Sequence, residues 1–362
     1  MELVRSLVYV ALSFLIALWW APSLIKLLRW LKFWKKQNRK INMLGGEYTD
    51  KTLKRFYEHD EAKVQIPRGG GLLIWINTLV FAGFFWILLK IDPDNKLFQS
   101  FNFVNRAQTF IPIGTLFFGS VVGFVDDALS TLESGGNYKA GGLKLSQRLL
   151  LISGLSIAIG YWFYSRAQIH VIDIFSYKID LYNIFGYNLG WLIIPYTLVV
   201  LLLLWGSSVI DGFDGLSGGV LAPIFICFAT IAYLKGFPEI STLMAVVSAS
   251  TLAFLWYNIS PAKFYMGDTG TTGLLLTLGV VAILTNTTFI LPIAGICLFG
   301  TVMSNIIQIF SKKVFKRKVF RAAPLHHHFE SLGMTRNQIV LRYWLITIIM
   351  CCLSISLVIL IK

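Results

Sequence analysis

The hydrophobic residues of this chain fall in long blocks, and the segments between the blocks hold most of the charges. Windows such as Thr197–Trp205 contain no charged residue. A soluble chain would instead show apolar stripes at the period of an amphipathic helix or strand. Blocks of about 20 apolar residues are long enough to cross a bilayer as helices. The pattern predicts an all-α polytopic membrane protein.

Ten blocks are predicted to span the membrane, and no segment between them is long enough to fold as a soluble domain. Residues 1–362 are therefore expected to form a single integral membrane domain. Alternating apolar and polar residues over His170–Tyr182 also permit a short β-hairpin. The predicted spans are 7–29, 71–90, 108–125, 147–164, 189–208, 217–234, 241–258, 271–287, 290–310 and 340–361.

Composition supports this interpretation, because 56% of the residues are hydrophobic and only 14% are charged. The first apolar block, Ser6–Trp20, lacks the basic start and small-residue cleavage site of a signal peptide, and it is expected to remain as a helix. The four cysteines all lie in apolar blocks without CxxC spacing. A disulfide framework or a zinc site is therefore not expected.

Lys and Arg residues gather in the loops that follow odd-numbered spans, chiefly in Lys32–Arg68, Lys139–Arg148 and Lys312–Arg321. Loops rich in Lys and Arg usually face the cytoplasm. Because ten is an even number, both termini are then expected outside the cytoplasm.

Five aspartates lie at the predicted cytoplasmic ends of the spans, each in a turn that contains glycine. Glycine allows a sharp turn and the close approach of a ligand. A single aspartate there could merely cap a helix or face water, but five on one face indicate a shared site. They are Asp126, Asp127, Asp211, Asp214 and Asp268.

If these turns converge, the carboxylates need a compensating cation. Two carboxylates ~7 Å apart repel by about 2.4 kcal/mol at an effective dielectric constant of about 20. Carboxylate and phosphate oxygens are ligands that Mg²⁺ prefers, and no Cys/His set for zinc accompanies them. The aspartates therefore predict a magnesium site.

Three consecutive histidines, His326, His327 and His328, precede Glu330 in the last predicted cytoplasmic loop. Imidazoles can donate hydrogen bonds to a phosphate or assist a leaving group. Metal binding and a plain exposed run are the alternatives.

Basic residues in the same loops suggest anionic ligands. Arg68 precedes consecutive glycines at the start of a span, where backbone N–H groups favour anions; it could also serve only to orient the chain. Lys144 and Arg148 could neutralise phosphate or only satisfy the charge bias. Ser311–Arg321 interleaves basic and apolar residues, which indicates an anionic membrane surface rather than a nucleic acid, or else a solvated orienting segment.

Together these motifs resemble the polyprenyl-phosphate N-acetylhexosamine-1-phosphate transferases. The matching segments are Gly123-Phe-Val-Asp-Asp127, Asp211-Gly-Phe-Asp-Gly-Leu216, Asn258 with Phe264-Tyr-Met-Gly-Asp-Thr-Gly270, and Pro324-Leu-His-His-His-Phe-Glu330. The unbroken His-His-His-Phe-Glu is similar to the phospho-N-acetylmuramoyl-pentapeptide branch of that family.

The resemblance implies transfer of phospho-N-acetylmuramoyl-pentapeptide from its UDP conjugate to undecaprenyl phosphate in a bacterial cytoplasmic (inner) membrane, with Mg²⁺. Asp268 is implied as a metal ligand and Asp211 as part of the metal site. Asp126 or Asp127 would orient or deprotonate the lipid phosphate. A homodimer is one assembly compatible with such a protein.

The resemblance also assigns the donor side of the site. Asp214 would shape the nucleotide site, and Asn258 and Tyr265 would lie near the uracil or the metal loop. His326, His327 and His328 would contact the sugar phosphate.

Two alternative functions are also compatible with parts of the sequence. Ile66-Pro-Arg-Gly-Gly-Gly71 is closer to transferases for other N-acetylhexosamines, and Ser208 replaces a common asparagine. A UDP-N-acetylglucosamine donor is therefore the nearest rival, against which the histidines argue. An ion-coupled transporter is the rival from another class, but it would place acidic residues near the bilayer midplane.

Overall fold

The computed structural model describes residues 2–34, 66–104, 108–132, 142–175, 177–184 and 186–361. Most of the first predicted cytoplasmic loop therefore lies outside the described residues. The α-helices are α1 (Glu2–Trp30), α3 (Gly71–Ile91), α4 (Lys96–Phe101), α5 (Phe110–Leu132), α6 (Leu145–Trp162), α7 (Ile193–Gly206), α8 (Leu216–Leu234), α9 (Pro238–Asn258), α10 (Gly267–Leu284), α11 (Leu291–Ala294), α12 (Ile296–Val314), α13 (Leu325–Ser331) and α14 (Arg336–Ile361).

Within the described residues, nine helices are long and apolar enough to cross a membrane, so the protein is an all-α polytopic membrane protein. They correspond to nine of the ten predicted spans. The remaining prediction, 290–310, is divided between the short α11 and the longer α12. Pro292 and Gly295 accompany this division, and α12 also carries Asn305 and Gln308, which lower its apolar content.

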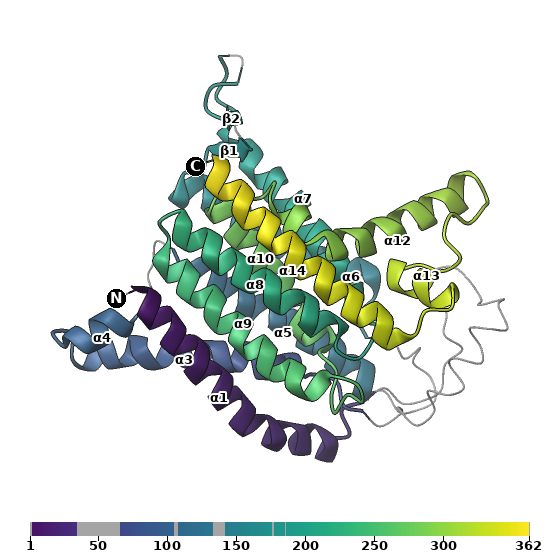
Figure 1. The fold of residues 1–362 in the computed structure, drawn as a ribbon. Coiled ribbons are helices and arrows are strands. Elements are labelled where there is room, and N and C mark those ends of the chain that lie inside the picture. The colour runs from purple at the N-terminus through teal and green to yellow at the C-terminus, as the bar shows by residue number, and fades with distance from the viewer. Residues whose placement is uncertain are drawn as a thin grey trace.

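The most buried helices, α8, α9 and α10, form the centre of the bundle. Their apolar windows are 78%, 83% and 89% buried, whereas the window of α14 is only 22% buried. The outer helices run alongside this centre (Figure 1). Many of their large apolar side chains are exposed, among them Trp19, Leu150 and Ile349. In a membrane protein, such exposed apolar faces are solvated by lipid. The bundle therefore has a protein-packed centre and a lipid-facing periphery.

Glycines allow α5 to pack closely against α10. A Cβ atom at Gly119 would lie 3.0 Å from the Cα of Gly273, and one at Gly123 would lie 1.9 Å from the backbone oxygen of Asp268. Small residues at such spacing let two backbones approach in a membrane. This packing brings the carboxylates of α5 next to the start of α10.

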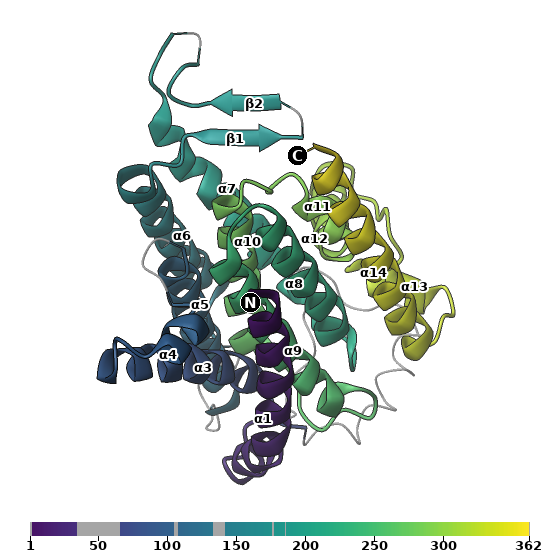
Figure 2. The same cartoon turned by 60° about the vertical axis from the view of Figure 1, so that its left-hand side comes forward.

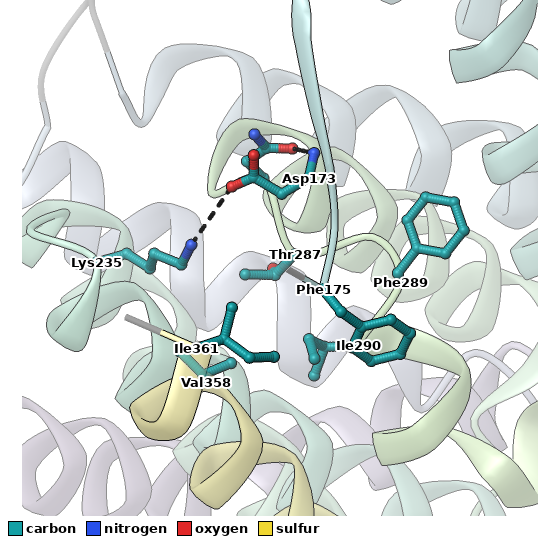
Figure 3. A pocket seen from close by; sticks show the side chains of 9 residues that line it. Asp173, Phe175, Lys235, Thr287, Phe289, Ile290, Val358 and Ile361 are labelled. Atoms are coloured by element: carbon teal, nitrogen blue, oxygen red, sulfur yellow. Dashed lines mark hydrogen bonds and ion pairs between the residues drawn. The ribbon is translucent and has the colours of Figure 1, made fainter. Parts of the chain in front are cut away.

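A two-stranded hairpin covers the opposite end of the bundle, as the alternating sequence suggested. Strand β1 (Val171–Ile174) pairs antiparallel with β2 (Tyr177–Asp180), and Figure 2 shows them beside the end of α14. The backbone N–H of Asp173 donates to Asn286 at 2.8 Å, and the carboxylate of Asp173 lies 3.7 Å from Lys235 (Figure 3). These contacts border a cavity of about 30 Å³.

The start of α1 and the end of α14 both lie at this hairpin end. Val358 and Ile361 of α14 line the same small cavity as Asp173. At the start of α1, Arg5 donates to the backbone oxygen of Ser100, which is at the far end of α3 from Gly71. The termini are therefore on one side, and the start of α10 is on the other.

Candidate active site

Three aspartates and two arginines meet where α5, α6 and α10 come together. The carboxyl groups of Asp126 and Asp268 share one ion-pair partner, Arg148. Arg148 on α6 lies 3.4 Å from Asp126 and 3.5 Å from Asp268. Arg68 lies 3.6 Å from Asp127. We call these five residues the carboxylate cluster.

Backbone and hydroxyl groups hold the carboxylate cluster in place. One oxygen of Asp127 accepts hydrogen bonds from the Thr269 backbone N–H at 2.9 Å and from its hydroxyl at 2.7 Å. The other oxygen is buried and has no hydrogen-bond partner apart from its ion pair with Arg68. Asp126 accepts from the Leu143 N–H at 2.6 Å. Asp126 and Asp127 are therefore each anchored by hydrogen bonds and also paired with an arginine of the cluster.

Asp211 ties the second aspartate turn to the start of α10. Its two oxygens accept from the Ser217 hydroxyl at 2.6 Å and from the Gly267 N–H at 2.9 Å. Burial raises the pKa of Asp211, while these two hydrogen bonds act in the opposite direction. Gly267 has φ +72°, and a Cβ there would lie 2.3 Å from Asp127. Glycine is therefore required at this junction.

Asp214 and Asn258 brace the same turn. Asn258 is 1% exposed; its oxygen accepts from the Gly215 N–H at 2.9 Å and its amide donates to the Phe264 oxygen at 2.8 Å. Asp214 accepts from the Ala262 N–H at 3.2 Å. Both side chains predicted to bind substrate thus use hydrogen-bonding atoms to shape the loops around the cluster.

The segment from Ile66 to Gly71 lies along the start of α10. Tyr265 donates its N–H to Pro67 at 2.8 Å, and Gly70 donates to the Tyr265 oxygen at 2.7 Å. A Cβ at Gly71 would lie 2.2 Å from the backbone of α10. This pairing directs Arg68 towards Asp127.

The histidines form a second group, which packs on Phe213 in the aspartate turn. The rings of His326 and His327 lie 5.0 and 5.1 Å from that of Phe213, both edge-on. His327 Nδ1 is 2.9 Å from Glu330, which accepts from Arg336 at 2.7 Å. We call the residues His326, His327, Glu330 and Arg336 the histidine group.

Burial and ion pairing give this group defined charges. Burial lowers the pKa of His326 well below its usual value, and the neighbouring His327 lowers it further. Both ring nitrogens of His326 are buried without a hydrogen-bond partner. For Glu330, burial raises the pKa, but hydrogen bonds from His327 and Arg336 outweigh it and leave the pKa below normal. His326 is thus neutral and Glu330 ionised near neutral pH.

Two predicted residues lie outside these contacts. Lys144 is exposed at the start of α6, where its backbone N–H donates to Gln147 at 2.9 Å, and no described carboxylate pairs with its ammonium group. His328 points away from His327: its ring accepts from the Arg321 N–H at 3.3 Å and contacts Phe320.

Conversely, sequence reasoning assigned no role to Arg336, Phe213 or Thr269. Arg336 holds Glu330, its guanidinium lies 5.3 Å from the Phe213 ring, and Thr269 anchors Asp127. Thr269 and Phe213 lie inside the aspartate-containing family motifs, and this position was the only indication in the sequence that they could contribute to the site. Arg336 lies outside these motifs, and only its positive charge could have suggested a role.

Among the described residues, no group of three or more His, Cys, Asp or Glu side chains is placed to hold a metal ion. Mg²⁺ commonly uses only one or two protein carboxylates and completes its shell with phosphate oxygens and water. Asp268 is partly exposed and adjoins Asp126, which fits this kind of site. Both oxygens of Asp211 already accept hydrogen bonds, so Asp211 is less well suited than Asp268 to bind a metal ion.

Comparisons with known proteins identify the family of this chain. A profile of glycosyl transferase family 4 matches residues 109–286. The phospho-N-acetylmuramoyl-pentapeptide-transferase of Acetivibrio thermocellus is 30% identical over 345 residues, covering 95% of this chain and 92% of that protein. The protein of the same name from Leptospira biflexa is 31% identical, covering 70% of this chain and 74% of its own length.

A third relative of that name, from Pelagibacter ubique, is 36% identical over 188 residues; the match spans 47% of this chain and about half, 51%, of the relative. The near-complete match to the Acetivibrio protein includes the residues of both the carboxylate cluster and the histidine group. This chain belongs to the phospho-N-acetylmuramoyl-pentapeptide-transferase family, within glycosyl transferase family 4.

Proposed function

We propose that the protein transfers phospho-N-acetylmuramoyl-pentapeptide from UDP-N-acetylmuramoyl-pentapeptide to undecaprenyl phosphate, forming lipid I and UMP. The observation that carries this proposal is the carboxylate cluster with its two arginines, placed at the helix ends of a membrane bundle beside the histidine group. The start of α10 is where a lipid phosphate at the membrane surface and a nucleotide from water could meet. Family membership supports this choice of substrates.

The proposal includes an orientation in a bacterial cytoplasmic membrane. The carboxylate end would face the cytoplasm and both termini would lie outside. The Lys and Arg bias of the loops supports this orientation. The position of both termini at the hairpin end is compatible with it.

In the proposed reaction, a lipid phosphate oxygen attacks the sugar-bound phosphorus of the donor. The bond from that phosphorus to the bridging oxygen breaks, and UMP leaves with the bridging oxygen. Asp127, whose second oxygen accepts no hydrogen bond and pairs only with Arg68, would accept a proton from the lipid phosphate, and Asp126 is the neighbouring candidate. Arg68 and Arg148 would neutralise phosphate charge, which phosphoryl transfer chiefly requires.

Asp268, with Asp211 behind it, would hold the Mg²⁺ ion, which when bound neutralises charge on the diphosphate. The braces made by Asp214 and Asn258 would shape the nucleotide side, together with Tyr265. His327 offers Nε2 to the sugar phosphate because its Nδ1 is held by Glu330. The buried ring of His326 would pack against the ring of His327 and hold it in position.

A donor comparison tests the proposed substrates. Purified protein is incubated with undecaprenyl phosphate, Mg²⁺ and either UDP-N-acetylmuramoyl-pentapeptide or UDP-N-acetylglucosamine, and UMP release and the lipid product are measured. We expect turnover with the muramoyl donor. Turnover with UDP-N-acetylglucosamine alone would contradict the donor assignment while leaving the type of reaction intact.

A further inference from the structure

The end of α12 projects from the side of the bundle and leads into a tight return. Figure 1 shows α12, in lime green, extending away from the other helices before the chain returns to α13. The return occupies Phe315–Arg321. Lys316 takes φ +57°, a left-handed conformation that reverses the chain. We call Ser311–Arg321 the basic turn.

Side chains of α12 fix the backbone of the basic turn. The amide of Gln308 donates to the Phe320 oxygen at 2.9 Å and accepts from the Val319 and Phe320 N–H groups at 3.1 and 3.0 Å. The Ser311 hydroxyl donates to the Arg317 oxygen at 2.9 Å. These bonds hold four backbone groups of the turn against α12. Most side chains between Lys313 and Val319 are exposed.

Those outward side chains are apolar and cationic in alternation. Phe310, Val314, Phe315 and Val319 each expose more than half of their surface. Six cations accompany them, and none pairs with a carboxylate among the described residues: Lys312, Lys313, Lys316, Arg317, Lys318 and Arg321. The sequence from Ile296 to Phe329 contains no acidic residue. This surface has apolar area and an unbalanced positive charge.

We propose that the basic turn is a binding surface for anionic phospholipid headgroups in the leaflet that adjoins the carboxylate cluster. An apolar stripe along α12, formed by Met303, Ile306 and Phe310, leads to the turn with helical spacing and is exposed as a lipid-facing stripe would be. The exposed side chains of Val314, Phe315 and Val319 enter the acyl boundary, and the charged groups of the Lys and Arg side chains reach lipid phosphates. Because the turn is positively charged, we expect it to bind anionic lipids more strongly than zwitterionic lipids.

The chemistry of the turn favours a lipid surface over a soluble anion. A nucleotide site would be concave with a few converging polar groups, whereas here the cations spread along an exposed turn among apolar side chains. Each cation near an anionic surface contributes to binding by about 1 kcal/mol, or about fivefold. Several together give a cooperative surface attachment.

The basic turn is also joined to α13, the short helix that carries the three histidines. The Arg321 N–H donates to the ring of His328 at 3.3 Å, and its guanidinium donates to the Ser331 oxygen at 3.4 Å. Phe320 packs against the same histidine with ring centroids 5.5 Å apart. Lipid attachment would therefore hold α13 at the height of the membrane surface.

Lipid retention measures the proposal without any enzymatic assay. The full-length protein is purified in mixed micelles with equal phosphatidylglycerol and phosphatidylcholine, and retained lipids are counted by native mass spectrometry. The test variant carries Lys316→Gln, Arg317→Gln and Lys318→Gln. The matched control removes three exposed cations from the end of α1, on the same side of the bundle, by Lys26→Gln, Arg29→Gln and Lys32→Gln. Thermal unfolding confirms that each variant is folded.

We expect the wild type and the α1 control to retain phosphatidylglycerol preferentially. The turn variant should lose that preference by about fivefold or more, and Phe315→Ser with Val319→Ser should reduce retention of both lipids. Equal losses in both triple variants would overturn the proposal, because net charge alone would then explain binding. Unchanged lipid retention with a raised KM for the UDP donor would also overturn it and assign the turn to the nucleotide. Because no donor is needed for the retention measurement, its result is independent of the proposed reaction.

Discussion

Residues around the cluster differ in whether their polar atoms are already committed. The side-chain atoms of Asp211 and Asn258 already make hydrogen bonds that shape the loops, to the Ser217 hydroxyl and to backbone groups. Asp127 and His327 each accept or share hydrogen bonds through one side-chain atom only; the other oxygen of Asp127 pairs with Arg68 without a hydrogen bond. Substitutions at the first pair should therefore act through loop geometry, and those at the second pair through the reaction itself.

Glu330 should position His327 for the reaction. In Glu330→Gln, the amide can still accept from His327 Nδ1 but then turns its NH₂ towards Arg336. Loss of charge-assisted hydrogen bonds costs about 2 kcal/mol, so we expect turnover to fall about thirtyfold with a smaller change in KM. Glu330→Asp, which keeps the charge, should recover part of the turnover. Equal turnover in the wild type and Glu330→Gln would refute this role.

Buried His326 should make stability depend on pH. Its folded-state pKa is lowered, so the unfolded chain binds a proton first as the pH falls below about 6.5. The free energy of unfolding should then decrease by up to about 1.4 kcal/mol per pH unit until the folded-state pKa is reached. Thermal unfolding between pH 7.5 and 5.5 should show a smaller pH dependence for His326→Gln than for the wild type. His170→Gln, at the exposed hairpin end, is the control and should behave as the wild type.

At the scale of elements, the α5–α10 contact sets the distance between Asp127 and Asp268. A methyl group at Gly123 would overlap the Asp268 backbone, and overpacking typically costs about 1–3 kcal/mol. Gly123→Ala should therefore lower turnover at least tenfold by separating the two helices. Gly114→Ala on the same helix meets nothing within 4 Å and is the matched control. Comparable activity of the two variants in the transferase assay would contradict this account.

The sequence predicted much of this element plan, for physical reasons. Block length identified the spans, and the positions of Asp126, Asp211 and Asp268 at span ends predicted their convergence. The prediction of one continuous span over 290–310 is wrong, because hydrophobicity alone does not show the helix break near Pro292 and Gly295. The hydrogen bond between Asn258 and Gly215 depends on two distant segments meeting in space, which single-sequence patterns do not encode. The contact between Arg336 and Glu330 is local, but it depends on the conformation of the turn between α13 and α14.

At the scale of the whole molecule, the carboxylate cluster and the termini occupy opposite ends of the bundle. Asp268 begins α10, whereas the end of that helix reaches the hairpin and the end of α14. In the proposed orientation, a single-cysteine Asp268→Cys variant should react with membrane-impermeant maleimide only from the cytoplasmic side of inverted vesicles. Labelling from the outer side of intact cells would contradict the orientation.

The most direct test of the account compares carboxylate variants in one transferase assay with and without Mg²⁺. UMP release from UDP-N-acetylmuramoyl-pentapeptide and undecaprenyl phosphate is measured for the wild type, Asp127→Asn, Asp268→Asn and the control Asp92→Asn, whose side chain accepts from Asn95 at the opposite end of α3 from the cluster. We predict Mg²⁺-dependent turnover in the wild type and in Asp92→Asn, and losses of about 100-fold or more in the two cluster variants. Near-normal turnover in folded Asp127→Asn and Asp268→Asn would contradict the claim that this cluster carries the reaction.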